Sequence, residues 1–336
     1  MAMRTESLSL NKEYDEKIRH LHLPLFKKAQ KIASTYILFH LGFLLVAGIE
    51  IALFLSFFAL LGKSSVLAFL LALFLLSLFS FFVLRLYLQA KKPQQLLLFC
   101  EEYLEECKAM MGYQEGIPEN HIALASLAQK LTKELHEREY FFYSPPEFLQ
   151  SLKITMEKFS SFCHWRDLHE MKEYLLSYAI DEHIKAVRCE PTHLEIHAAL
   201  ANAYVMLSSL YADPRKYEGC DEEKYIPAER LSDEMQQKFC EIAGRAIEEF
   251  KILNDYAPED PWIHIQLAYS YHDLQMPEEE MQEYEIVLKL CPEDNETLFK
   301  LGMLYFQQGK HAKGLRIYET LKKTHHQKAE NLIKFY

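Results

Sequence analysis

Two long runs of apolar residues lie near the N-terminus of the chain. The first covers 34–61 and holds one charged residue, Glu50. The second covers 66–88 and also holds one charge, Arg85, close to its end. A helix of about 20 apolar residues is long enough to cross the hydrocarbon core of a bilayer. Each run is therefore predicted to be a transmembrane helix, and the short link 62–65 makes the two helices antiparallel.

The chain from Pro93 onward shows a different pattern. Its apolar residues recur mostly with the helical period, and clusters rich in Gly, Pro and Asp interrupt them. No segment shows the alternation of a strand. We expect an all-α fold. The predicted parts are a basic polar segment (1–33), a transmembrane hairpin (34–92), further helices without an assigned register (93–159), and a repeat region with a final cap helix (160–336).

Several residues of the C-terminal half recur at intervals of 34 positions. Pro258 and Pro292 are one such pair, and Phe250, Tyr284 and Tyr318 form a series. The same interval separates Leu267 from Leu301, Ala268 from Gly302, and Tyr271 from Tyr305. This pattern resembles the tetratricopeptide repeat, in which each 34-residue unit is a pair of helices. The resemblance predicts a helical-repeat solenoid whose neighbouring pairs share one core.

The resemblance divides the region into the units 160–193, 194–260, 261–294 and 295–328. The last unit matches best, and Gly302 is predicted to lie where its two helices meet closely. The unit 194–260 is split by an insert, and 160–193 keeps only Ala179 and Ala186 in register. In 261–294, His264 replaces the usual large residue and Glu280 the usual alanine. These departures predict looser packing of that helix pair.

Charge is spread unevenly along the chain. The net charge is −11, yet residues 1–92 hold eleven Lys and Arg against five Asp and Glu. The acidic remainder argues against a nucleic-acid partner. Lysines and arginines flank the outer ends of both apolar runs, namely Lys27, Lys28, Lys31, Arg85, Lys91 and Lys92. Because such residues stay on the cytoplasmic side, we predict a multi-pass membrane protein with cytoplasmic N- and C-termini.

No motif for catalysis, a cofactor or a metal stands out, so we expect no enzyme activity, no cofactor and no metal. His193 and His197 have the spacing of metal ligands on one helix face, but the Glu between them is misplaced for the His-Glu-x-x-His motif. We interpret them as the polar start of a helix. The seven cysteines include no Cys-x-x-Cys pair. They are expected to be reduced, mostly buried thiols.

The repeat resemblance also implies a concave groove, lined by the first helix of each pair, that holds a peptide. By the family register, the groove residues are Asn202, Gln266, Tyr269, His272, Phe299, Lys300, Met303 and Phe306. Members that bind chaperones clamp a carboxylate with Asn and basic residues. Here Ala198 and Glu296 replace two of those basic residues, so that ligand is not predicted. Tyr269 and Phe306 either line the groove or fill the core between pairs.

The favoured function is a membrane-anchored scaffold or adaptor that binds a protein or peptide partner at the cytoplasmic face. The hairpin is also similar to that of inclusion-membrane proteins of obligate intracellular bacteria, which implies a bacterial protein. An intramembrane carboxylate is a candidate functional group. Glu50 has two possible partners. One is a serine of the second helix, where Ser77 lies level with it, and the other is the Glu50 of a second chain in a homo-oligomer. The alternative function is an accessory subunit of a membrane enzyme or transporter that uses Glu50.

Overall fold

The computed structural model describes residues 31–32, 35–36, 38–58, 65–142, 147–216 and 224–336. The segment 1–30 and most of the link between the apolar runs lie outside these residues. Every regular element described is a helix, so the all-α prediction is confirmed. The helices form two compact units. The first holds the described residues up to Tyr113 with 130–175 and 224–225, and the second holds 114–129, 176–216 and 226–336.

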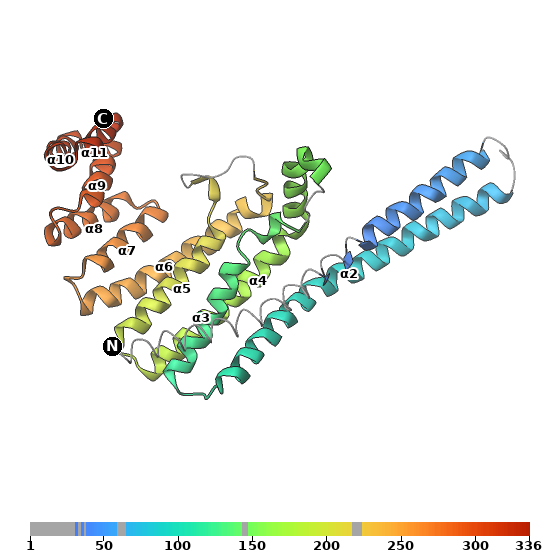
Figure 1. The fold of residues 1–336 in the computed structure, drawn as a ribbon, viewed down its shortest axis with the longest axis horizontal. Coiled ribbons are helices and arrows are strands. Elements are labelled where there is room, and N and C mark those ends of the chain that lie inside the picture. The colour runs from blue at the N-terminus through green and yellow to red at the C-terminus, as the bar shows by residue number, and fades with distance from the viewer. Residues whose placement is uncertain (1–30, 33–34, 37, 59–64, 143–146, 217–223) are drawn as a thin grey trace. The chain divides into compact units, whose positions relative to one another are not determined.

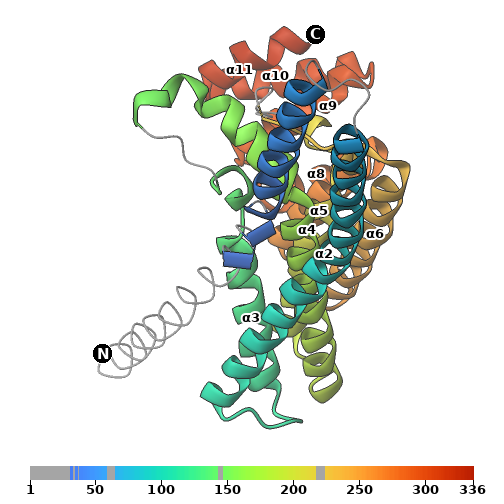
Figure 2. The same cartoon turned by 90° about the vertical axis from the view of Figure 1, so that its right-hand side faces the viewer.

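The first unit contains a helical hairpin. The helix Leu38–Phe58 runs beside the N-terminal half of α2 (Ser65–Met111), as two views show (Figures 1 and 2). Ser77 donates a hydrogen bond to Glu50 Oε1 at 2.7 Å, which confirms that these residues lie level. Both helices are long and apolar enough to cross a membrane, and their apolar windows are not buried inside the protein.

Helix α2 continues well past the second apolar run. It is a single helix of 47 residues that passes through Pro93, so the boundary expected between 92 and 93 falls inside a helix. A proline removes one backbone hydrogen bond, but the Leu, Gln, Glu and Lys residues around it favour helix. Beyond Pro93 the apolar residues form one buried stripe, made of Leu96, Phe99, Cys100, Tyr103, Leu104 and Cys107.

Two further helices follow, α3 (Pro118–Glu134) and α4 (Lys153–Cys189), with the 3-10 turns Arg138–Tyr140 and Glu147–Leu152 between them. Because α4 is one helix of 37 residues, the prediction of a helix pair in 160–193 is wrong. The reason is that this stretch has no Gly or Pro to end a helix before Cys189. In the second unit, buried His121 of α3 bonds buried Glu182 of α4 at 2.6 Å.

Three consecutive helix pairs make up most of the second unit. They are α5 (Leu194–Tyr211) with α6 (Asp233–Tyr256), α7 (Pro261–Asp273) with α8 (Pro277–Leu290), and α9 (Asn295–Gln307) with α10 (His311–Thr324). Helix α6 also packs on α7, and α8 on α9, so each pair stacks on the next. The short helix α11 (His326–Leu332) and the turn Ile333–Phe335 pack on the last pair. The predicted helical-repeat solenoid is confirmed.

The insert in the first pair contains two short 3-10 turns, Pro214–Lys216 and Ala228–Leu231. Between them, 217–223 lies outside the described residues. The cysteines differ from expectation. Cys100 and Cys107 are buried, but Cys189, Cys240 and Cys291 are exposed, so the expectation of mostly buried thiols is wrong. Cys189 ends α4 and Cys291 caps α8, and helix ends of this kind face solvent.

Candidate partner-binding face of the repeats

Equivalent turns bound the last two helix pairs. Asp260 and Asp294 each cap a first helix by accepting a hydrogen bond from the backbone N–H two residues further on, at 2.9 and 3.0 Å. Gln275 and Gly309 each follow a first helix with a positive φ, 58° and 69°. Each of these matched residues lies 34 positions from its counterpart, so structure repeats with sequence. The second unit is a tetratricopeptide-like solenoid.

His264 and Glu280, which depart from the repeat pattern, are both buried, with 3% and 4% of their surface exposed. His264 Nε2 lies 2.9 Å from the carbonyl oxygen of Pro258, and its Nδ1 lies 2.7 Å from Glu283 Oε2. The ring thus joins the preceding turn, α7 and α8. Glu280 bonds His272 Nδ1 at 3.1 Å. The prediction of looser packing is wrong, because hydrogen bonds between the helices replace the usual apolar contacts.

His197 makes the same two contacts one pair earlier. Its Nδ1 lies 2.8 Å from Glu249 Oε2, and its Nε2 lies 3.0 Å from the Pro191 carbonyl oxygen. Both partners only accept, so both ring nitrogens donate when the imidazole is protonated. Burial opposes that charge, but these two hydrogen bonds outweigh it and raise the pKa of His197. Both nitrogens of His197 are therefore occupied by protein partners, while His193 is exposed at the start of α5.

A signal for these histidine bonds was present in the sequence and was missed. His197 and His264 each follow a proline by six positions, and Glu249 and Glu283 are 34 positions apart. The interval that identified the repeat thus also marks the polar pair. Within the described part of the chain, no group of three or more His, Cys, Asp and Glu residues is arranged to hold a metal ion.

Most of the predicted groove residues lie at the surface of α5, α7 and α9. Asn202, Tyr269 and His272 are exposed, and Gln266, Phe299, Lys300 and Met303 are half-buried. Tyr269 is 41% exposed. Lys300 of the next first helix donates to its hydroxyl at 3.1 Å, and the ammonium lies 4.3 Å from the ring centroid. An aromatic ring therefore stands at the surface beside a cation. We call these seven residues the Tyr269 face.

Phe306 has a different environment, with 4% of its surface exposed. It packs in a cluster with Leu298, Leu321 and other residues of the last pair and α11. Its ring fills the space at Gly314, where an added Cβ would lie 2.5 Å from Phe306 Cε1. Tyr336 packs edge-on against the ring, with the centroids 5.6 Å apart. Of the two alternatives, Phe306 fills the core, so its prediction as a groove residue is wrong.

Glu50 is the remaining residue singled out by the sequence. One carboxylate oxygen accepts the hydrogen bond from Ser77. The other, Oε2, is buried and has no hydrogen-bond partner among the described residues. The serine alternative is therefore the one observed within a single hairpin.

No protein-family model matches the sequence, and no curated protein matches it. Among solved structures, the chain is similar to YrrB, a TPR protein with an unusual peptide-binding site, at 14% identity over 69% of this chain and 97% of that one, with a TM-score of 0.34. It is also similar to a thermophilic TPR protein of Thermus thermophilus, at 14% identity over 65% of this chain and 97% of that one, with a TM-score of 0.32. With TM-scores this low, the repeat architecture rests on the helix pairs and matched turns of the chain itself.

Proposed function

We propose that the protein is a scaffold anchored in a membrane by its hairpin, whose helical repeats bind a protein or peptide at the cytoplasmic face. Anchoring is supported by the apolar side chains that cover the hairpin. Leu44, Leu45 and Phe79, for example, are 66%, 64% and 67% exposed. A contiguous apolar surface of this kind needs a membrane or another protein to cover it. The lysines and arginines at the outer ends of the spans favour cytoplasmic termini.

Partner binding is supported by the Tyr269 face, and the exposed ring of Tyr269 is the observation that carries the proposal. A tyrosine held in place by a neighbouring lysine loses little conformational entropy on binding, and tyrosine is frequent among the residues that dominate binding energy. Gln266 and His272 supply hydrogen-bonding groups beside it. The expected partner is therefore a segment with an apolar anchor and polar flanks, rather than a free C-terminal carboxylate.

The alternative function, an accessory subunit that uses Glu50 in a path through the membrane, has less support. Ser77 donates to this carboxylate, so one of its oxygens contributes to hairpin packing. The unpartnered Oε2 is buried within the hairpin, so it does not favour a contact between two copies, and a homo-oligomer through the hairpin stays a prediction.

The partner proposal is tested by selecting peptides from a display library on the full chain in detergent. Bound peptides should lose about 2 kcal/mol or more of binding energy to Tyr269→Ala, which is roughly thirtyfold in Kd. The thermal midpoint should hardly change, because the ring is exposed. The matched control is Tyr256→Ala, since Tyr256 is 60% exposed but lies at the end of the second helix α6. Equal binding by the wild type and Tyr269→Ala would remove the proposed face.

The membrane proposal is tested with reporters fused at residue 1 and after Tyr336. Both should report the cytoplasmic side, and alkaline washing should leave the chain in the membrane pellet. A reporter on the far side at either end would contradict the hairpin topology. Release of the chain by alkali would contradict anchoring itself.

A further inference from the structure

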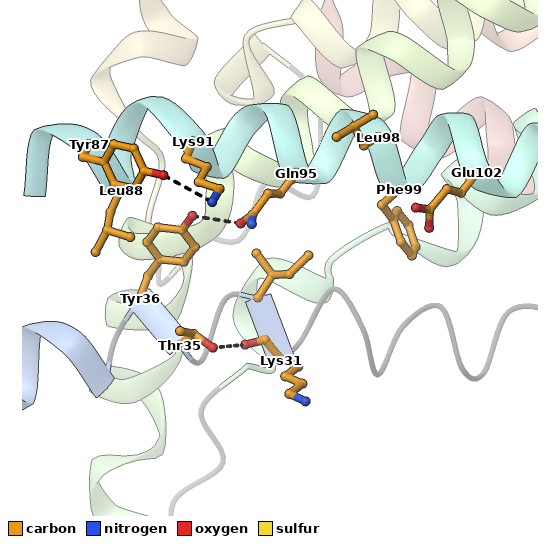
Figure 3. Close-up of a pocket in the computed structure, with 11 residues that line it drawn as sticks. Lys31, Thr35, Tyr36, Tyr87, Leu88, Lys91, Gln95, Leu98, Phe99 and Glu102 are labelled. Atoms are coloured by element: carbon orange, nitrogen blue, oxygen red, sulfur yellow. Dashed lines mark hydrogen bonds between the residues drawn. The ribbon is translucent and has the colours of Figure 1, made fainter. Parts of the chain in front are cut away.

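A pocket of about 450 Å³ lies in the first unit, between residues 31–32 and 35–36 on one side and the middle of α2 on the other (Figure 3). Tyr36 donates a hydrogen bond to Gln95 Oε1 at 3.0 Å, and Lys91 Nζ lies 3.3 Å from the hydroxyl oxygen of Tyr87. In Figure 3 these four side chains gather in the space between the two segments. The pocket therefore has a polar centre that contains one ammonium and two phenol groups.

The pocket begins where the apolar part of α2 ends. From Ser65 to Tyr87 the helix rises about 33 Å at about 1.5 Å per residue, close to the roughly 30 Å of a bilayer core. Tyrosines concentrate at the boundary between hydrocarbon and water. In a hairpin that spans a membrane, Tyr36 and Tyr87 lie at that boundary. Lys91, one turn further along α2, then lies at the depth of the lipid phosphates.

The charges of the pocket are distributed along its length. Lys91 has no carboxylate partner among the described residues, whereas its neighbour Lys92 forms an ion pair with Asp167. Lys31 lines the same pocket from the other segment. The lining carboxylate is Glu102, which follows Lys91 by about 16 Å along the helix axis. The end of the pocket nearest the membrane thus holds the ammonium of Lys91, and the carboxylate of Glu102 lies beyond the reach of a headgroup phosphate there.

We propose that this pocket binds the headgroup phosphate of a phospholipid, whose acyl chains lie along the hairpin. The proposal rests on the proposed membrane anchoring. Lysine binds phosphate as a point charge, and the hydroxyl of Tyr87, which accepts from Lys91, keeps its own hydrogen to donate. Leu88 lines the same pocket on the membrane side of Lys91 and offers apolar contact to the glycerol and the first methylenes. Basic pockets at the cytoplasmic ends of membrane helices bind anionic headgroups in this way.

The test uses the full chain in detergent and native mass spectrometry. Three probes are added separately: dioleoyl phosphatidylglycerol, dioleoylglycerol with the same chains but no phosphate, and soluble glycerol 3-phosphate. The wild type should retain one phosphatidylglycerol with an affinity roughly tenfold or more above that for dioleoylglycerol. Lys91→Gln should lose about tenfold of this affinity, and Lys91→Glu more. Glycerol 3-phosphate should not be retained, because it lacks the chains that place the phosphate.

The matched control is Lys108→Gln, which removes the same charge from α2 about 25 Å further along the helix. It should bind phosphatidylglycerol as the wild type does. The helical circular dichroism and the thermal midpoint should be equal in all variants, and a variant that differs has a folding defect. Tyr87→Phe, which removes only the hydroxyl beside Lys91, is a second and milder variant and should lose less affinity for phosphatidylglycerol than Lys91→Gln.

Three results would overturn the proposal. They are equal retention by the wild type and Lys91→Gln, equal retention of lipid and dioleoylglycerol, and retention of glycerol 3-phosphate as tight as that of the lipid, which would make a free phosphate the ligand. Failure of the membrane proposal is recognised separately. If alkali releases the wild type from membranes, the proposed membrane anchor is wrong. If the wild type and Lys91→Gln both stay in the membrane and retain the lipid equally, only the headgroup site is wrong.

Discussion

In the pairs α7/α8 and α9/α10 the first helix has the same aspartate cap and is followed by the same kind of turn, yet different side chains hold the two pairs together. In α7/α8, His264 bonds Glu283. The equivalent residues of α9/α10, Leu298 and Ile317, are apolar and pack in one cluster. The difference shows that this backbone accepts either a hydrogen-bonded pair or an apolar pair at these two positions.

A second pair of positions shows the same kind of difference. His272 bonds buried Glu280 in α7/α8, and the equivalent residues in α9/α10 are Phe306 and Gly314. The ring of Phe306 occupies the volume that any side chain at 314 would need. Glycine is otherwise unfavourable inside a helix by about 1 kcal/mol, so its presence in α10 follows from the size of its neighbour.

The largest effect should come from removing the ring that distinguishes the last pair. Phe306→Ala should lower the free energy of unfolding by about 3–5 kcal/mol, because a buried phenyl ring leaves a cavity. Denaturant unfolding of the full chain in detergent measures this. The control is His272→Ala at the equivalent position, which is exposed and should cost much less. Equal effects of the two substitutions would contradict the contrast between the pairs.

The next largest effect should come from placing only one member of the His264–Glu283 pair at the equivalent position of α9/α10. Leu298→His should cost about 2–4 kcal/mol, because Ile317 stands where a carboxylate would be needed and the imidazole is left with an unpaired nitrogen. The double variant Leu298→His with Ile317→Glu should recover part of this loss. The same unfolding experiment measures both, and a double variant no more stable than the single one would show that the two positions are not coupled.

The close contact at Gly302 should give a moderate effect. An added Cβ there would lie 2.7 Å from Leu332 Cδ2 and 3.0 Å from Ile317 Cγ2, which confirms that the helices meet closely at this residue. Gly302→Leu should lose about 1–3 kcal/mol by overpacking. Gly244→Leu is the matched control, since nothing lies within 4 Å of a Cβ at Gly244 in α6. An unchanged thermal midpoint for Gly302→Leu would show that α11 moves to accept the larger side chain without loss of stability.

The smallest effect should be a pH dependence of the stability contributed by the His272–Glu280 pair. The hydrogen bond with Glu280 raises the pKa of His272. This contribution is therefore complete below the ordinary histidine pKa of about 6.5 and is lost as the pH rises through the higher folded value. The difference in thermal midpoint between the wild type and His272→Gln should be larger at pH 6 than at pH 9. His197 titrates in both proteins, so its contribution cancels in this difference. A difference in midpoint that is the same at both pH values would show that the His272–Glu280 pair does not titrate.

The sequence by itself determined the class of the molecule. Two long apolar runs with one charge each identify two helices of membrane-spanning length, and the 34-residue interval of tyrosines and prolines identifies paired helices, because both signals are local in the chain. It also placed Ser77 level with Glu50, since a short link between antiparallel helices leaves little freedom in their register.

Only the tertiary structure decided what each repeat position does. Phe306 and Tyr269 both project from first helices, but Phe306 is covered by Gly314 and the C-terminal residues, while Tyr269 stays at the surface beside Lys300. The single helix α4 replaced an expected pair, and His197 and His264 proved to be buried beside carboxylate partners. Burial and partner choice depend on side chains that are distant in sequence and meet only when the helices stack, so the period of the chain cannot specify them.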